Sequence, residues 1–218
     1  MIQMFDVSMR YKEDIEVLHK FDMSVENGEF AFLVGSSGAG KTTVLRLLYR
    51  ELIPSEGQIV VAGQNLSKIK SAQLPYFRRK LGIVFQDFKL LSGKTVSQNI
   101  AFSMRVTGAR RTQIKKSVDR VLEWTNLTHR RNALPEDISG GEQQRASIAR
   151  AMVNNPQLIL ADEPTGNLDP KLSLEIMQLF ERLNTNGATV LVATHDINLV
   201  RQMGKRVIGI ERGRITEE

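Results

Sequence analysis

One segment near the N-terminus carries the residue types expected to bind a chain of phosphates. Residues 35–42 read Gly-Ser-Ser-Gly-Ala-Gly-Lys-Thr, a full match to G-x-x-x-x-G-K-[ST]. The glycines let backbone N–H groups curl around phosphate oxygens, and a helix that follows would point its positive end at them. We expect Lys41 to reach the β- and γ-phosphates and the Thr42 hydroxyl to ligate Mg²⁺. The predicted binding residues are Gly35, Ser36, Ser37, Gly38, Ala39, Gly40, Lys41, Thr42 and Thr43.

Two carboxylates follow an apolar run in the C-terminal half. Residues 158–161 are all apolar, and Asp162 and Glu163 come directly after them. A phosphate site needs a second Mg²⁺ ligand, and Asp162 is placed to supply it. Glu163 stands where a carboxylate can polarise the water that attacks a terminal phosphate. By itself the pair would be an acidic turn before Pro164, but beside a phosphate loop we interpret it as catalytic.

Apolar runs and helical periodicity predict the elements that hold these residues. An apolar run at 30–34 leads into the glycine segment and a helical pattern at 41–49 follows it, which predicts a strand–loop–helix unit. Other strands are predicted at 2–7, 58–61, 158–161 and 189–193, other helices at 112–126, 137–155 and 172–183, and a hairpin at 207–215 turning at Arg212-Gly213. The polar residues of interest follow strand ends, where open α/β sheets bind ligands.

The middle of the chain has a different pattern from its flanks. Helical periodicity there places apolar residues such as Val118 and Leu122 on one face, with Lys115 and Lys116 largely off it. We therefore predict one domain over residues 1–218. In it, residues 1–86 and 156–218 form an α/β nucleotide-binding core, and residues 87–155 form an inserted helical subdomain.

Composition and charge restrict the class of protein. The 218 residues include no cysteine, which excludes disulfides and thiolate metal sites and favours the cytoplasm. We find no apolar run near the ~20 residues that cross a bilayer, and no secretory signal at the start. The net charge is +6, but residues 78–131 hold thirteen Lys or Arg and three Asp or Glu, a local +10. This predicts a surface that meets something anionic, with a merely solvated face as the equal alternative.

Several further segments resemble the ABC-transporter ATPases, in the family's order and over essentially the whole chain. Tyr11 stands where the family has an aromatic residue that stacks on adenine, and Gln86 resembles the Q-loop glutamine. Residues 138–145, Ile-Ser-Gly-Gly-Glu-Gln-Gln-Arg, resemble the signature motif, and residues 166–169 resemble the D-loop. His195 resembles the switch histidine. Two positions depart from the commonest signature, with isoleucine at 138 and glutamate at 142.

The resemblance implies a fold, a reaction and an assembly. The implied fold is a P-loop NTPase core, with a mostly parallel sheet and an N-terminal antiparallel β portion. The implied reaction is ATP hydrolysis with Mg²⁺, in which Glu163, His195 and Gln86 are catalytic and Thr42, Gln86 and Asp162 hold the metal. The implied assembly is a head-to-tail homodimer. In it Ser139, Gly140 and Gly141 contact the γ-phosphate of ATP held by the other protomer.

Within the family, the chain resembles the branch that acts in bacterial cell division. The segments that carry this likeness are residues 77–82, 84–91, 151–156 and 193–199. Members of that branch pair with an integral membrane protein of the FtsX type and act in the control of cell-wall hydrolysis. The resemblance therefore implies a peripheral protein on the cytoplasmic face of the plasma membrane. It implies no nucleic-acid partner. There, Arg110, Arg111, Lys115 and Lys116 are expected to touch anionic lipid or an acidic tail.

Three other functions remain open at this stage. Residues 162–169 are shared with the ATPases of lipoprotein-releasing and macrolide exporters, so they do not separate those from the cell-division branch. DNA-associated ABC ATPases insert long coiled coils between phosphate loop and signature, but here 98 positions separate Lys41 from Ser139. A regulator that binds nucleotide without hydrolysis is disfavoured by the intact Asp162, Glu163 and His195.

Overall fold

Strands and helices alternate along most of the chain in a computed structural model, which describes residues 1–11, 15–166 and 168–217. The strands are β1 (Ile2–Arg10), β2 (Glu16–Val25), β3 (Phe30–Val34), β4 (Glu56–Val61), β5 (Gln64–Asn65), β6 (Leu81–Val84), β7 (Leu158–Asp162), β8 (Thr189–Thr194), β9 (Arg206–Glu211) and β10 (Arg214–Glu217). The helices are α1 (Lys41–Leu48), α2 (Leu74–Arg78), α3 (Val96–Val106), α4 (Arg111–Trp124), α5 (Gly140–Met152), α6 (Pro170–Thr185) and α7 (Ile197–Met203).

The strands form two sheets of different character. The larger sheet has the order β10-β9-β3-β8-β7-β6, and its strands from β9 to β6 pair in parallel, with β10 antiparallel at one edge. The smaller sheet, β2-β1-β4-β5, is antiparallel. The predicted fold, a mostly parallel sheet with an N-terminal antiparallel portion, is confirmed.

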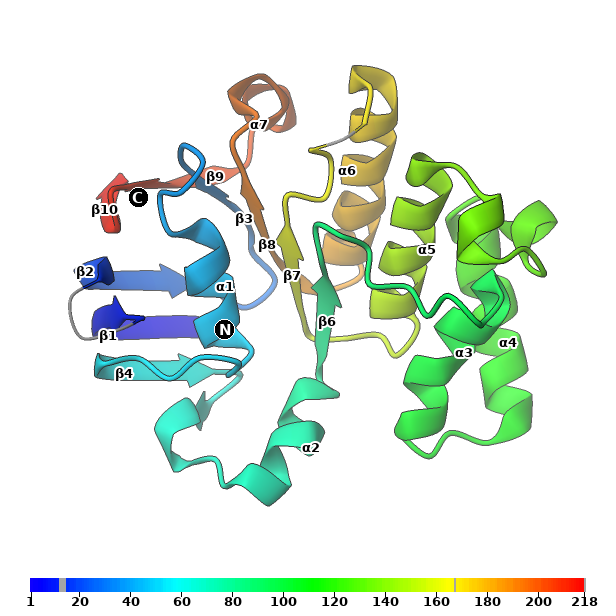
Figure 1. Ribbon diagram of the computed structural model, residues 1–218, viewed down its shortest axis with the longest axis horizontal. Helices are drawn as coiled ribbons and strands as arrows, with labels where there is room; N and C mark the ends of the chain where they lie inside the picture. Colours follow the sequence, from blue (N-terminus) through cyan, green and yellow to red (C-terminus); the bar gives the residue numbers. More distant parts are fainter. Residues whose placement is uncertain (12–14, 167, 218) are drawn as a thin grey trace.

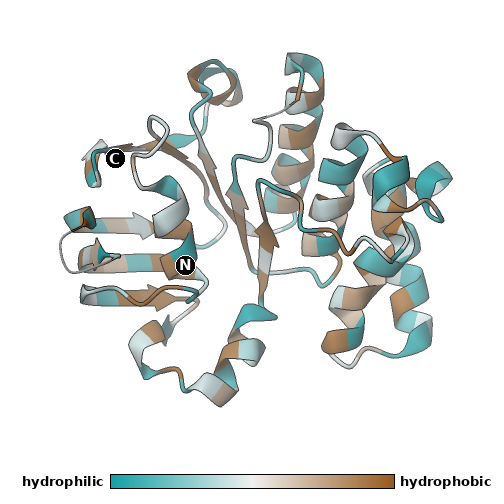
Figure 2. Ribbon diagram, viewed as in Figure 1, coloured by the Kyte–Doolittle hydropathy of each residue, from teal (hydrophilic) through white to brown (hydrophobic). Residues whose placement is uncertain are grey.

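Two apolar cores lie on opposite faces of the larger sheet. Along β3, Phe30 and Phe32 belong to one core, while Ala31 and Leu33 belong to the other, as the alternation of side chains along a strand requires. The first core packs against α3 to α6, and the second packs against α1 and the smaller sheet. Figure 1 shows α1 between the two sheets, and Figure 2 shows the apolar central strands that separate the cores.

The helices α3, α4 and α5 lie together at one end of the molecule (Figure 1). Thr95 begins α3 with a capping box, in which its hydroxyl accepts from the Gln98 N–H and the Gln98 side chain accepts from the Thr95 N–H. Val118, Val121 and Leu122 are buried on the inner face of α4. No helix among the described residues is both long and apolar enough to cross a membrane.

Most predicted elements are present, although several boundaries differ. The hairpin turn at Arg212-Gly213 is confirmed. Both residues have positive φ, 47° and 74°, as the type I′ turn of a two-residue hairpin requires. The helix predicted within 137–155 is α5, which begins after Ser139 because that residue is extended. No separate element was predicted for β2, β5, α2, α3 or α7. Alternation of Phe21, Met23 and Val25 with polar residues could have found β2.

Candidate functional site

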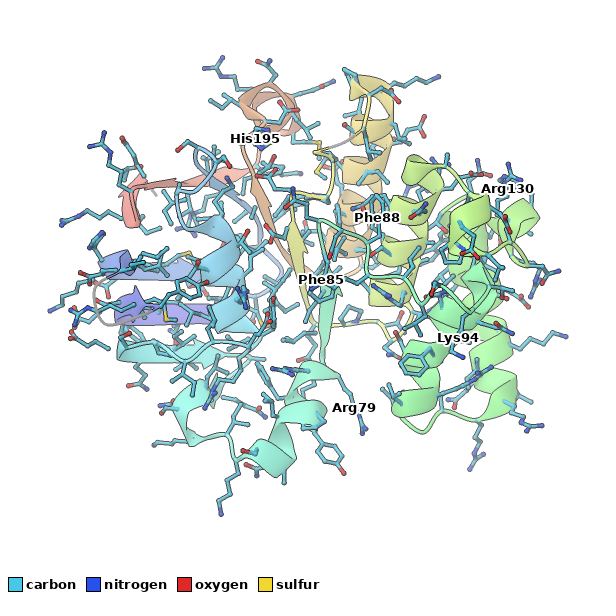
Figure 3. The ribbon with its side chains drawn as sticks, viewed as in Figure 1. Arg79, Phe85, Phe88, Lys94, Arg130 and His195 are labelled. Carbon is cyan, nitrogen blue, oxygen red and sulfur yellow. The ribbon has the colours of Figure 1, made fainter. Side chains whose placement is uncertain are left out.

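The predicted phosphate loop opens onto a pocket of about 330 Å³ at the carboxyl ends of the parallel strands. The segments that meet there come from the loop before α1, the end of β6, the end of β7 and the end of β8. Figure 3 shows His195 beyond the end of β8. The lining residues are Val17, Ser37, Gly38, Gly40, Lys41, Thr42, Thr43, Gln86, Glu163 and His195.

The loop takes its shape from glycine at the position just before α1. Gly40 has φ 111°, a conformation that L side chains rarely adopt, and a Cβ there would lie 2.7 Å from Leu18 Cδ2. Because Gly40 turns the chain so sharply, α1 begins immediately at Lys41. The exposed N–H groups of Ser37 and Gly38 and the start of α1 thus belong to one concave surface.

Lys41, Glu163 and His195 form a continuous chain of polar contacts across the pocket. The Lys41 Nζ donates to the carbonyls of Gly35 at 2.8 Å and Ser36 at 3.0 Å. It also lies 3.2 Å from Glu163 Oε1, and both of these side chains are at most one-tenth exposed. The other oxygen, Glu163 Oε2, lies 3.0 Å from His195 Nδ1. An ionised carboxylate only accepts hydrogen bonds, so Nδ1 carries the proton in this contact.

The backbone at Glu163 is in an uncommon conformation for a residue with a side chain. Its φ is 44°, and its N–H donates to the Ala193 carbonyl at 2.9 Å, which ties it to the end of β8. Its own carbonyl accepts from the Gly166 N–H at 3.2 Å. Such strained conformations persist where the surroundings hold them, and they gather at functional sites. This geometry turns the Glu163 carboxylate into the pocket instead of along the strand.

Thr42 and Asp162 bring two oxygen ligands to one point, as the chemistry of Mg²⁺ requires. The Thr42 hydroxyl donates to Asp162 Oδ1 at 3.1 Å. Burial raises the pKa of the Asp162 carboxyl, and the Thr42 hydrogen bond opposes that rise. Gln86, the third predicted ligand, is exposed and lines the same pocket. A hydroxyl, a carboxylate and an amide beside a phosphate loop fit Mg²⁺, which prefers few protein ligands and several phosphate or water oxygens.

Tyr11 lies beside the phosphate loop. Its hydroxyl is 3.1 Å from the Thr43 hydroxyl and accepts a hydrogen bond from Arg46 Nη1 at 3.5 Å. The residue is 41% exposed. The position is compatible with the predicted stacking on a base, which stays a prediction.

The signature segment stands apart from this pocket. Ser139 caps α5 through a hydrogen bond from the Glu142 N–H to its hydroxyl at 3.3 Å, and its own N–H donates to Glu142 Oε2 at 2.9 Å. Arg130 also donates to Glu142 at 2.8 Å. The Ser139 N–H bond and then Arg130 lower the pKa of the Glu142 carboxyl to about 2. A Cβ at Gly141 would lie 2.3 Å from Leu172 Cδ2, so a larger residue there would require the Leu172 side chain to move.

The structure therefore unites one part of the predicted site and separates another. The phosphate loop, Gln86, Asp162, Glu163 and His195 lie around one pocket, whereas Ser139, Gly140 and Gly141 begin α5 and do not line it. The analysis of the sequence missed Val17 in the pocket wall and Arg130 beside Glu142, and neither carries a signal in its own segment. Asn167, in the predicted D-loop, lies outside the described residues.

Comparison with known families gives a consistent result. A family model described as ABC transporter matches residues 18–166. The chain is 51% identical over 217 residues to the cell division ATP-binding protein FtsE of Streptococcus pneumoniae, covering 100% of this chain and 94% of that protein. It is 47% identical to FtsE of Bacillus subtilis, with 100% and 96% covered. It is 42% identical to FtsE of Escherichia coli, with 99% and 97% covered.

Solved structures resemble the chain over the same length. One is a dimeric bacterial ABC transporter cassette, with a TM-score of 0.92, 36% identity, and 100% of this chain and 97% of that chain covered. Another is a dimeric ATP-binding cassette in a post-hydrolysis state bound to ADP and Pi, with a TM-score of 0.91, 34% identity and the same coverage.

Proposed function

Because this chain belongs to the ABC transporter family, and within it to the FtsE cell-division ATP-binding proteins, we propose that it hydrolyses ATP to ADP and phosphate as the ATPase subunit of a membrane complex in cell division. The observation that carries the proposal is the contact of Glu163 with both Lys41 and His195 in the phosphate pocket. It places a carboxylate base, a cation for the phosphates and an imidazole at one point.

Each of these residues has a distinct part in the proposed reaction. Glu163 accepts a proton from the attacking water as oxygen bonds to the γ-phosphorus and the bond to ADP breaks. Lys41 places positive charge beside the phosphate oxygens, where negative charge develops. His195, already hydrogen-bonded to Glu163, orients that carboxylate and faces the terminal phosphate. The backbone N–H groups of residues 37–40 hold the remaining oxygens.

Thr42, Asp162 and Gln86 are the proposed ligands of a Mg²⁺ ion that accompanies ATP. When bound, the ion neutralises phosphate charge and fixes the β- and γ-phosphates relative to each other. The support is the Thr42–Asp162 contact at 3.1 Å and the place of Gln86 in the same pocket. Tyr11 is the proposed contact for the adenine base.

A homodimer completes the proposed site. Ser139, Gly140 and Gly141 stand at the positive end of a helix, where an anion is favoured, yet they do not line the pocket of their own chain. We propose that they contact the γ-phosphate of ATP bound by a second copy. Both solved relatives described above are dimeric, which supports this arrangement.

The membrane partner is proposed to dock on the groove between the core and the helical part. In this proposal the core comprises residues 1–86 and 156–218, and the helical subdomain comprises residues 87–155. A groove of about 420 Å³ lies between α2, β6, α3 and α5, with Phe85 and Val106 among its apolar walls and Arg79 at its rim. Its occupant would be an FtsX-like membrane protein, with this chain at the cytoplasmic face of the plasma membrane.

The proposed activity predicts phosphate release from Mg-ATP by the purified chain. Lys41→Ala should weaken ATP binding by roughly 10–100-fold, because a charge-assisted contact to the phosphates is lost. Phosphate release and binding of a fluorescent ATP analogue measure the two effects. Absence of hydrolysis by the unmodified chain, both alone and in vesicles with an FtsX-like partner, would contradict the proposal.

The basic surface at the start of α4 supports the proposed membrane contact. Arg110, Arg111, Lys115 and Lys116 are all exposed. Arg111 and Lys115 also flank a groove of about 370 Å³ between α3 and α4. Figure 1 places the α3–α4 turn at the same edge of the molecule as α2, which borders the proposed docking groove. Basic groups near an anionic leaflet gain about 1 kcal/mol each.

Reversing these four residues to Glu should reduce co-sedimentation with anionic vesicles that contain the partner. ATP hydrolysis by the free chain should stay nearly unchanged, since none of the four lies in the nucleotide pocket. Added salt should weaken the wild-type interaction in the same direction. Reversal of Lys20, Arg201, Arg212 and Arg214, which are exposed elsewhere on the core, is the matched control. Sedimentation that is insensitive to both the reversal and salt would leave the surface as a solvated face.

A further inference from the structure

Two consecutive residues just after Gln86 adopt left-handed backbone conformations. Phe88 has φ 55° and Lys89 has φ 47°, and neither residue type favours this region. The Lys89 N–H donates to the Asp87 carbonyl, which closes a very tight turn. A strained turn of this kind persists only where neighbouring groups hold it. The segment 85–89 has internal contacts, such as the Phe88 N–H to the Phe85 carbonyl at 3.3 Å, and contacts outside itself add to them.

Two side chains of α5 supply those contacts. The Ser147 hydroxyl donates to the Phe88 carbonyl at 3.2 Å. The Arg150 guanidinium donates to the same carbonyl at 2.8 Å through Nη2, and to the Lys89 carbonyl through Nη1. The planar fork of Arg150 thus bonds both strained residues at once. We call these three hydrogen bonds between α5 and residues 88–89 the α5 latch.

The electrostatics of Arg150 are unusual for a structural arginine. Burial lowers the pKa of its guanidinium, and among the described residues no carboxylate is paired with it. A largely buried charge without an opposite charge is costly, and carbonyl dipoles are its compensation here. A neutral side chain would avoid this cost, so the latch has a reason other than simple packing.

The same segment is anchored to the core at its other end. The Phe85 ring meets the Tyr49 ring edge-on, with centroids 6.2 Å apart, at the end of α1. Gln86 therefore lies between a residue held by the core and two residues held by α5, as the labels Phe85 and Phe88 in Figure 3 help to show. A shift of α5 relative to the core would therefore act on the short segment that carries Gln86.

We propose that Ser147 and Arg150 are positioning residues, which hold residues 88–89 against α5 and thereby set the place of Gln86 in the nucleotide pocket. This inference rests on the proposed function, in which Gln86 is a ligand of the metal. The signature residue Ser139 caps the first turn of α5, and Arg150 lies near its other end. In the proposed dimer, α5 therefore connects two sites. Its first turn contacts the ATP of the second copy, and its other end holds the segment that carries Gln86.

The test measures metal binding in the absence of turnover. Each variant is made in the Glu163→Gln background, loaded with ATP and titrated with Mn²⁺, whose binding is followed by electron paramagnetic resonance. Arg150→Lys keeps the charge but cannot bond two carbonyls with one planar fork, and it should weaken Mn²⁺ binding about tenfold. Ser147→Ala removes a single neutral hydrogen bond and should weaken it about threefold. ATP affinity in EDTA should not change in either variant.

Two controls separate positioning from general damage. Arg120→Lys is the matched arginine variant: Arg120 bonds Asn155 at 2.9 Å and stacks on Trp124, away from the latch, so Mn²⁺ binding should not change. In a Gln86→Ala background, Arg150→Lys should add little, because the ligand that it positions is already gone. If Arg150→Lys fails to fold, Ser147→Ala still carries the test, since it keeps every contact of the arginine.

The possible results are distinct. Weaker Mn²⁺ binding for the Gln86 and latch variants, without additivity, supports the latch. Weaker binding for Gln86→Ala alone, with both latch variants like the parent, overturns the latch and leaves the proposed function intact. Unchanged binding for Gln86→Ala overturns both the metal role of Gln86 and the latch that depends on it. A parent that binds no ATP contradicts the proposed function itself.

Discussion

Glu163→Gln should lower the rate of ATP hydrolysis by roughly 10²–10⁴-fold while ATP binding persists. Glutamine keeps the shape of the side chain and can still bond His195, but it cannot accept the proton of the attacking water. Because the nucleotide that joins the two protomers is no longer cleaved, the ATP-bound dimer should accumulate. Phosphate release measures the first effect, and gel filtration with Mg-ATP measures the second.

Glu181→Gln is the matched control for this prediction. Glu181 pairs with Lys205 at 2.7 Å on the outer surface of α6, so its loss should leave turnover unchanged. Full turnover by Glu163→Gln would remove Glu163 from its role as base. Loss of ATP binding in that variant would instead indicate that the carboxylate shapes the pocket, since Glu163 contacts Lys41 directly.

Ser139→Arg should abolish most hydrolysis, by at least about 10²-fold, although the variant monomer still binds ATP. The expected cause is a steric clash in the dimer. Ser139 does not line the pocket of its own chain, so an arginine there leaves that pocket intact and obstructs the site shared with the second copy. ATP binding to the monomer and phosphate release at high protein concentration measure the two effects.

Thr95→Arg tests whether the effect of Ser139→Arg comes only from loss of a helix cap. Thr95 begins α3 with the same capping box that Ser139 uses at α5, and it lies outside the nucleotide pocket. The two substitutions should therefore cost similar stability, about 1 kcal/mol, measured by thermal unfolding. Only Ser139→Arg should lose hydrolysis. Normal turnover by Ser139→Arg would show that the head-to-tail arrangement is wrong.

The sequence predicts the central part of the fold because that part is encoded locally. The strands at 30–34, 158–162 and 189–194 are largely buried, and each contains a continuous run of four or five apolar residues. The smaller sheet is harder to predict, since its strands have one exposed face and carry charged residues. In β2, only Phe21, Met23 and Val25 alternate cleanly. Short helices such as α2 and α7 have too few turns for a periodic pattern.

In the candidate site, too, the residues of local motifs can be predicted from the sequence, whereas contacts between distant segments cannot. The phosphate loop is one run of consecutive residues, and so is the pair of carboxylates at the end of β7, so motif and spacing identify them. Arg150 meets the Phe88 carbonyl across 62 positions, and Arg130 meets Glu142 from a separate turn. No pattern within one segment predicts such contacts, because they depend on how the helices pack. The signature and the pocket lie apart for another reason: in the proposed homodimer, the signature of one chain meets the pocket of the other.

The ion pair between Lys41 and Glu163 also bears on the order of events during turnover. In this structure the lysine that should hold phosphate is neutralised by the carboxylate that should act as base. In this arrangement both carboxylate oxygens are engaged, Oε1 by Lys41 at 3.2 Å and Oε2 by His195 at 3.0 Å. An incoming triphosphate competes for the same lysine, and by winning it releases Glu163 toward water. Binding of ATP would then free the Glu163 carboxylate to act as the base. Without ATP, the carboxylate would stay paired with Lys41.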